Sequence, residues 1–422
     1  MLKKLKDIYN KSTYDYSEGY VDPFEYHKTF YFWLKIFGVV EGNNIKHGYL
    51  KHNALVFTTG FACVIFAIIS FCRGLYFFEI PMITEGGTYV IVLMYQLLIL
   101  SCTETNLPQF KSLLTSMQED FQYICTAGQK YRKRYFDIQL QTWKASLFSI
   151  VFTYALAFGM VSFASVALVY YLITHGPEDK GSRPLLFPFW LPHVDFGKTP
   201  IYEITFMFSN ISAVVYAHNY IFMIQTQIVW IRHIASKVDI VIWSIQDVLE
   251  GIRPAKNQEE KMYYAMIIKG RMREIIKHHQ SMYSLMENYS EVYKKMLIFE
   301  QTFCGPVVCL TAYCTAEKLD EGEVNMILIL LSIGTVVLYF IPSQLCTFLR
   351  IKVSSVCNAC WGIDFWNGGV VLKSYLVLIM QRSLRPLPLQ VPGFQEMSIQ
   401  TFSSKMTSAY SCFNMLRQAN RK

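Results

Sequence analysis

Hydroxyl side chains recur at helical spacing near the C-terminus, in the stretch SIQTFSSKMTSAYSCFNMLRQ at 398–418. On a helix, steps of 3 and 4 residues place one largely polar row on a single face: Thr401, Ser404, Ser408, Ser411, Met415 and Gln418. The opposite face carries an apolar row: Ile399, Phe402, Met406, Ala409, Phe413 and Leu416. Across a lipid bilayer, a row of hydroxyl groups lines water or packs against another helix, and the spacing alone leaves both possibilities open.

Lining water is the possibility with the more definite consequences. The 21 residues of 398–418, at about 1.5 Å rise each, span roughly 31 Å, which is enough to cross a bilayer. One helix cannot enclose a channel, so several copies must surround it. Met415 would then form an apolar constriction, with Gln418 one turn above it and the hydroxyl groups of Ser408 and Ser411 below. No acidic residue lies on this row, so strong cation selectivity is not expected.

The remaining residues form no recognisable catalytic or metal-binding pattern. Cys357 and Cys360 have CxxC spacing, but no second pair lies nearby, and a structural zinc ion needs four ligands. His278 and His279 are adjacent, so they point in different directions on a helix. HExxH, GxSxG and phosphate-binding loop patterns are also absent from the sequence. We therefore expect neither an enzyme nor a bound metal or cofactor.

The composition indicates a membrane protein. Of 422 residues, 53% are hydrophobic and only 17% are charged, which is too apolar for an ordinary soluble domain. Seven segments are long enough to cross a bilayer: 54–78, 82–104, 145–173, 201–231, 296–316, 324–349 and 398–418. The predicted fold is therefore an all-α polytopic membrane protein with seven transmembrane helices. The net charge of +8 comes mostly from residues in the connections, so we do not expect nucleic-acid binding.

The positions of the lysines and arginines predict the orientation. The connections at 1–53, 105–144, 232–295 and 350–397 hold 8, 6, 11 and 5 of them, and the opposite side holds 8. This excess predicts a cytosolic N-terminus and an extracellular C-terminus. The predicted organisation is a cytosolic segment at 1–53, spans one to six with helical cytosolic extensions at 54–349, an anchor segment at 350–397, and the pore-lining span with a short tail at 398–422.

Within the anchor segment, Lys373–Gln381 predicts a short apolar helix, and Pro386, Pro388 and Pro392 then interrupt the chain. Nine residues cannot cross the membrane, so we expect this helix to pack in a subunit interface. The outer connection between spans three and four contains the aromatic stretch RPLLFPFWLP at 183–192. It could form a lid, or it could lie in the aromatic belt at the membrane surface, and the sequence favours neither.

Two stretches resemble a known family. The C-terminal run with KSYLVLIMQRSLRPLPLQ and MSIQTFSSKMTSAYSCFNMLRQ is similar to the insect odorant receptors, as is RPLLFPFWLP followed by IYEITF. Gustatory receptors carry T-Y, five residues, then Q-F; here only Gln418 matches, which favours the odorant branch. The inner loop is shorter than that of the shared co-receptor, so the chain resembles a ligand-tuning subunit.

The resemblance implies a ligand-gated, nonselective cation channel in the plasma membrane of olfactory neurons, assembled as a heterotetramer with the co-receptor. In this family the last helix lines the central pore, and the gate residues correspond to Met415 and Gln418. The family's odorant pocket lies in the outer half of spans two to six. The corresponding residues here are Tyr89, Leu93, Phe158, Ser162, Phe163, Phe206, Asn210 and Tyr313. They suit a small neutral volatile molecule, although plain helix packing would explain each of them as well.

Three alternatives remain. The first is a gustatory-type chemoreceptor channel, which would differ from an odorant receptor only in belonging to the sister branch. A secondary transporter would show internal repeats with broken helices, and the sequence shows no such symmetry. A receptor that signals through G proteins would have the opposite orientation. Currents that require the co-receptor would distinguish a channel from a transporter, which would move its substrate across the membrane.

Overall fold

The structure is a computed structural model that describes residues 19–40, 46–174, 183–187, 189–253, 255–322, 324–385, 387 and 396–420. The regular elements in these ranges are α2 (Pro23–Tyr26), α3 (Lys28–Ile36), α4 (Lys46–Phe77), α5 (Ile80–Thr105), α6 (Leu107–Thr126), α7 (Gln129–Thr174), α8 (Ile201–Gln246), α9 (Gln258–Asp320), α10 (Met326–Trp361), the 3₁₀ helix η1 (Phe365–Gly368), α11 (Gly369–Ser383) and α12 (Ile399–Asn420). The described residues contain no strand, so the all-α prediction is confirmed.

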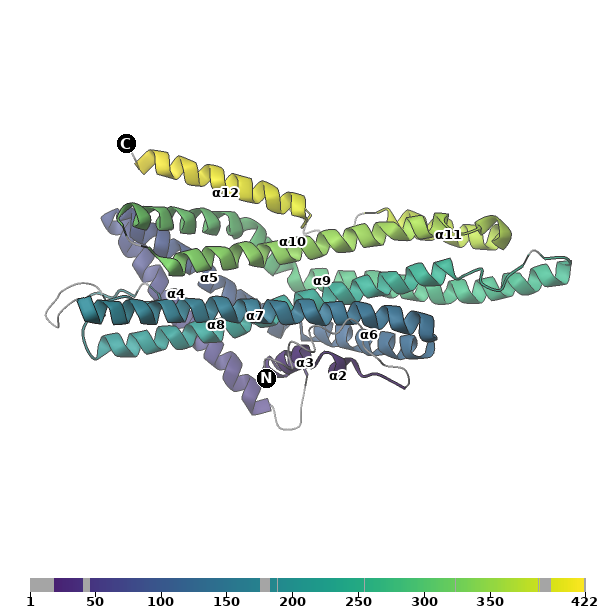
Figure 1. Ribbon diagram of the computed structural model, residues 1–422, viewed down its shortest axis with the longest axis horizontal. Coiled ribbons are helices and arrows are strands. Elements are labelled where there is room, and N and C mark those ends of the chain that lie inside the picture. The colour runs from purple at the N-terminus through teal and green to yellow at the C-terminus, as the bar shows by residue number, and fades with distance from the viewer. Residues whose placement is uncertain are drawn as a thin grey trace.

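The four long helices α7, α8, α9 and α10 lie side by side along the long axis of the molecule (Figure 1). Helix α8 is central, because it contacts α7, α9 and α10 and nearly every side chain from Ile221 to Val241 is buried. Helix α4 crosses this bundle obliquely and packs against α5. The chain therefore forms one elongated helical bundle around α8.

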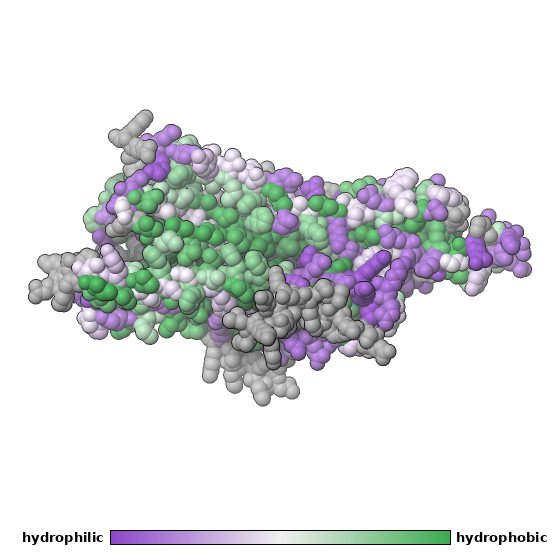
Figure 2. All heavy atoms as spheres, in the orientation of Figure 1, coloured by the Kyte–Doolittle hydropathy of each residue, from purple (hydrophilic) through white to green (hydrophobic). Residues whose placement is uncertain are grey.

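The two ends of the bundle differ in polarity. Apolar residues cover the half that contains α4, α5 and the C-terminal part of α9 (Figure 2). Polar residues gather at the other end, where Figure 1 places α6, α11 and the N-terminal half of α9. We call the second region the polar end; the lysine and arginine positions predict that it is cytosolic.

Five of the described helices contain a segment apolar enough to cross a membrane: His52–Phe77 of α4, and α5, α7, α9 and α10. The predicted spans 201–231 and 398–418 form α8 and α12, which are long enough but more polar. In α8, Asn219 donates a hydrogen bond to the Gln96 side chain at 2.8 Å, and Gln225 donates to Ser149 at 2.8 Å. Polar side chains paired between helices are tolerated in a membrane, so the hydropathy of a central helix understates its burial.

A buried polar cluster joins α6 to α8 at the polar end. Lys237 Nζ lies 2.7 and 2.9 Å from the two carboxylate oxygens of Asp120 and 3.1 Å from Ser116 Oγ. Burial raises the pKa of Asp120, and Lys237 opposes this shift. His233 Nε2 is 3.3 Å from Asp120, but burial and Lys237 lower the pKa of His233 well below its ordinary value. The cation that faces Asp120 is therefore Lys237.

Next to this cluster, His27 connects the N-terminal helices to α7. Its Nε2 atom lies 3.0 Å from Gln139 Oε1, and Gln139 Nε2 donates to Ser236 of α8 at 3.2 Å. Burial lowers the pKa of His27 to about 4, and the hydrogen bond with Gln139 opposes part of that shift. The polar end is thus held by specific buried polar contacts as well as by apolar packing.

The short helix predicted at Lys373–Gln381 lies within α11, which packs against α9 and α10. Tyr283 of α9 donates a hydrogen bond to the Arg382 carbonyl oxygen at 3.2 Å, and the Arg382 guanidinium lies 4.1 Å from the centre of the Tyr283 ring. Several apolar side chains of α10, η1 and α11 are exposed: Ile351, Trp361, Trp366, Val377 and Leu378. The predicted break at Pro386, Pro388 and Pro392 lies outside the described residues.

Candidate functional site

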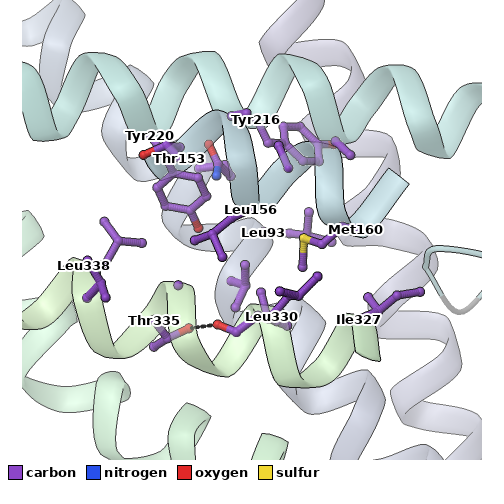
Figure 3. A pocket seen from close by; sticks show the side chains of 18 of the residues that line it. Leu93, Thr153, Leu156, Met160, Tyr216, Tyr220, Ile327, Leu330, Thr335 and Leu338 are labelled. Atoms are coloured by element: carbon purple, nitrogen blue, oxygen red, sulfur yellow. Dashed lines mark hydrogen bonds between the residues drawn. The ribbon is translucent and has the colours of Figure 1, made fainter. Parts of the chain in front are cut away.

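A cavity of about 130 Å³ lies between α5, α7, α8 and α10 in the apolar half (Figure 3). Its wall is almost entirely apolar and includes Val92, Leu93, Leu156, Met160, Ile327, Leu330, Leu331 and Leu338. Leu186 and Phe187 of the outer connection also contribute to the wall. Apolar cavities of about 150 Å³ stay dry and accept a benzene-sized molecule, so this one can hold a small apolar ligand.

Small residues on facing helices leave this space open. A methyl group added at Gly334 of α10 would meet Leu156 of α7 at 3.4 Å, and one added at Gly159 would meet Leu330 at 3.2 Å. Ala157, Ala213 and Ala217 also line the cavity. The helices α7, α8 and α10 therefore stay in contact around the cavity without filling it.

The hydroxyl groups around the cavity are mostly paired within the protein. Thr153 donates to the Ser149 carbonyl at 2.9 Å, and Thr335 donates to the Leu331 carbonyl at 2.9 Å, which is the dashed bond in Figure 3. Tyr89 donates to the Leu186 carbonyl oxygen at 3.1 Å and so ties α5 to the outer connection. The cavity therefore offers a ligand apolar contact with few hydrogen bonds.

Helix α12 lies at the edge of the bundle and contacts α9 and α10 (Figure 1). Its apolar row turns inward at Ala409, which is buried, and at Phe402, whose ring packs against Tyr339 and Phe340 with ring centres 5.5 Å apart in each pair. Leu416, at the end of the row, is 39% exposed. The polar row of α12 turns outward, and pale and purple residues mark this edge in Figure 2. In the single chain, the row predicted to face water is therefore exposed from Ser404 to Gln418.

Each residue of the polar row can be placed. Ser404, Ser408, Ser411 and Gln418 are exposed, and Met415 is 62% exposed. Thr401, near the start of the helix, is buried, and its hydroxyl donates to the Glu396 carbonyl at 2.8 Å. Farther along, Ser408 Oγ donates to the Ser404 carbonyl at 2.9 Å, and Ser411 Oγ donates to the Thr407 carbonyl at 3.0 Å. With their protons used inside the helix, these hydroxyl oxygens present lone pairs outward.

Comparison with known proteins identifies the family. A sequence profile described as 7tm Odorant receptor matches residues 102–410. The chain belongs to the odorant receptor family. It is therefore a multi-pass membrane receptor and not an enzyme. The resemblance noted in the C-terminal run is confirmed.

Individual relatives of this receptor are distant. It is 22% identical over 194 residues to odorant receptor 49a of Drosophila melanogaster, covering 46% of this chain and 47% of the relative. It is 23% identical over 194 residues to odorant receptor 85f of the same organism, covering 45% and 47%. The chain thus spans about half the length of the curated relatives it matches.

Two solved structures share the fold of this receptor. Both are of the insect olfactory receptor OR5 from Machilis hrabei. The TM-score is 0.67 for the first structure and 0.71 for the second, which is a complex of OR5 with eugenol. Sequence identity is 16% and 15%, and each comparison covers 94% of this chain and 98% of the other. The helical architecture is therefore that of an insect olfactory receptor.

The residues predicted for the odorant pocket are dispersed in this receptor. Tyr89 and Leu93 of α5 line the cavity. Phe158 is 73% exposed and borders a separate apolar groove between α7 and α8. The other predicted residues lie away from the cavity wall: Ser162, Phe163, Phe206, Asn210 and Tyr313. Among these, Phe206 stacks with Tyr202, and Tyr313 donates to Glu317 at 2.9 Å.

Sequence reasoning included the sixth span, which is α10, in the predicted pocket but named none of its residues. Ile327, Leu330, Gly334, Thr335 and Leu338 line the cavity from this side. Their spacing is helical, and a Gly-Thr pair within an otherwise bulky apolar span was the available signal. Such a pair also occurs where two helices simply pack closely together. The sequence alone therefore could not show that this pair lines a cavity, because that depends on where α7 lies.

Proposed function

We propose that this chain is a ligand-tuning subunit of a ligand-gated cation channel, which works with a co-receptor in the plasma membrane of olfactory neurons. A small, mostly apolar volatile molecule binds in the cavity between α5, α7, α8 and α10. The bound ligand opens a central pore lined by α12 of each subunit, with Met415 and Gln418 at the gate.

The exposed polar row of α12 is the observation that carries this proposal. A face of hydroxyl groups along a membrane-crossing helix is poorly suited to lipid. The same helix buries its apolar row against α9 and α10, so its orientation is fixed. Hydroxyl oxygens that accept but do not donate toward the lumen would stabilise passing cations, and several subunits are needed to enclose such a lumen.

Two further observations support the assembly and the ligand. Exposed apolar side chains gather at the polar end, on the last turn of α10 and on η1 and α11: Trp361, Trp366, Val377 and Leu378. They are suited to contact with neighbouring subunits. The related fold of Machilis hrabei OR5 was solved with eugenol, a small molecule of the size class proposed here. The cavity's apolar wall suits a neutral ligand over a charged one.

Cysteine accessibility tests the pore. In a Cys412→Ser background, which removes the exposed thiol of α12, Ser408→Cys and Ala409→Cys are compared in cells that also express the co-receptor. A charged methanethiosulfonate reagent should block odorant-evoked current through Ser408→Cys and leave Ala409→Cys, on the buried row, unchanged. Equal reactivity of the two positions, or no reaction at Ser408→Cys while the channel conducts, would show that this face does not line the pore.

A further inference from the structure

A second, smaller cavity of about 50 Å³ adjoins the first, between α5, α8, α9 and α10. The two cavities share four wall residues: Val92, Tyr220, Thr335 and Leu338. In Figure 3, Tyr220, Thr335 and Leu338 lie at one end of the main cavity, opposite Ile327 and Met160. We call the smaller space the inner cavity; it extends the main cavity toward the polar end.

The inner cavity contains polar atoms that the protein leaves unpaired. Glu300 of α9 is only 6% exposed; its Oε1 atom accepts a hydrogen bond from the Tyr95 hydroxyl, and its Oε2 atom is buried without a partner. The Tyr339 hydroxyl of α10 is also buried without a partner. Both side chains line the inner cavity. Of the other hydroxyl groups that line this cavity, that of Thr335 donates to the Leu331 carbonyl and that of Tyr95 to Glu300.

Unpaired polar atoms at this depth are costly. A carboxyl oxygen without a hydrogen bond in apolar surroundings loses its solvation and gains nothing in return. A carboxyl group inside a membrane span marks a functional site more often than a structural one. A hydroxyl group is suited to both atoms, because it can donate to a carboxyl oxygen such as Glu300 Oε2 and accept from a phenol hydroxyl such as that of Tyr339.

We propose that the inner cavity is a subsite for the hydroxyl group of an alcohol or phenol, whose apolar body occupies the main cavity. This inference rests on the proposed ligand site and adds the chemical class of the ligand. An ether of the same size can accept a hydrogen bond from Tyr339 but donates none to Glu300. A single water molecule would also fit, and a ligand hydroxyl would displace it while reproducing its hydrogen bonds.

Competition binding tests the subsite with three probes of matched shape. The receptor in lipid nanodiscs, purified with its co-receptor, binds tritiated propylbenzene as the tracer, and 2-phenylethanol competes against its isomer benzyl methyl ether. We expect the alcohol to compete about tenfold more strongly than the ether, the factor that one additional hydrogen bond to a carboxyl group supports. Equal competition by the isomers, or no competition by 2-phenylethanol, would overturn the subsite.

Two variants assign the preference to the inner cavity. Tyr339→Phe removes a hydroxyl that has no partner in the protein, so it should weaken the alcohol several-fold and leave propylbenzene unchanged. Tyr95→Phe combined with Glu300→Met removes both members of the existing hydrogen bond and should make the alcohol and the ether equivalent. An alcohol preference that survives both variants would place the hydroxyl group elsewhere.

A third variant separates failure of the subsite from failure of the ligand site. Leu330→Trp fills the main cavity, so it should abolish propylbenzene binding. Propylbenzene binding that Leu330→Trp removes, together with equal competition by the two isomers, would reject the subsite alone. Absence of propylbenzene binding to the unmodified receptor, or binding that Leu330→Trp leaves intact, would reject the proposed ligand cavity and the subsite together.

Discussion

Replacing Lys237 with methionine removes the cation from the buried cluster at the polar end. Asp120 would then keep Ser116 and the neutral His233 nearby, but no positive charge within hydrogen-bonding distance. Breaking a buried ion pair on one side costs about 3–5 kcal/mol, because the remaining charge stays buried. We therefore expect Lys237→Met to lower the apparent melting temperature of the purified receptor clearly, and Asp120→Asn with Lys237→Met to recover most of that loss.

The pH dependence of this variant checks the electrostatic cause. Burial already raises the pKa of Asp120, and Lys237 opposes the shift; without Lys237 the pKa must rise further. The Asp120 carboxyl can then be neutralised by a proton, so the loss of stability in Lys237→Met should shrink as pH falls from 8 to 5.5. Thermal unfolding in detergent, followed by tryptophan fluorescence, measures it. A loss that is independent of pH, or that Asp120→Asn does not relieve, would mean that Lys237 acts through packing alone.

Two further predictions concern other contacts. Burial lowers the pKa of His27 in the folded protein to about 4, whereas its ordinary pKa of 6.5 applies in the unfolded chain. As the pH falls below 6.5, the unfolded chain therefore takes up a proton before the folded protein does. The free energy of unfolding should decrease between pH 6.5 and 4, by roughly 3 kcal/mol in total. His27→Gln, which can keep a hydrogen bond to Gln139, should lose less of its melting temperature between pH 7 and 5 than the unmodified receptor; an equal loss would assign the acid sensitivity elsewhere. Arg417 of α12 pairs with the exposed Asp320 of α9, so Asp320→Asn should cost less than about 1 kcal/mol and high salt should erase the difference. A large, salt-independent drop in the melting temperature would contradict that expectation.

The helical class and the two faces of α12 could be predicted from the sequence because each follows from local spacing. Apart from the buried Thr401 and the exposed Leu416, the apolar row of α12 lies inward and its polar row outward, as the steps of 3 and 4 residues predict. A helix was also predicted at 201–231, although the buried Asn219 and Gln225 lower the hydropathy of this segment; α8 begins at Ile201 and continues to Gln246. Whether the polar row of α12 lines a pore depends on other subunits and stays a prediction.

The cavity was less predictable because its wall comes from four helices. Tyr89 and Leu93 lie on its wall, whereas Phe158 on α7 points outward, although all three are apolar or aromatic residues in membrane spans. Composition cannot distinguish these positions, since lipid and a ligand cavity select the same side chains. The inner-cavity carboxyl of Glu300 was missed because an acidic residue near the start of an apolar segment looks like a span end until its burial is known.

Tyr339 contacts both the inner cavity and the final helix. Its side chain lines the inner cavity, and its ring also packs on Phe402 near the start of α12, with ring centres 5.5 Å apart. A molecule that fills the inner cavity would therefore press against the same ring that supports the final helix. Under the proposed function, Tyr339 is the side chain through which a bound ligand would act on α12.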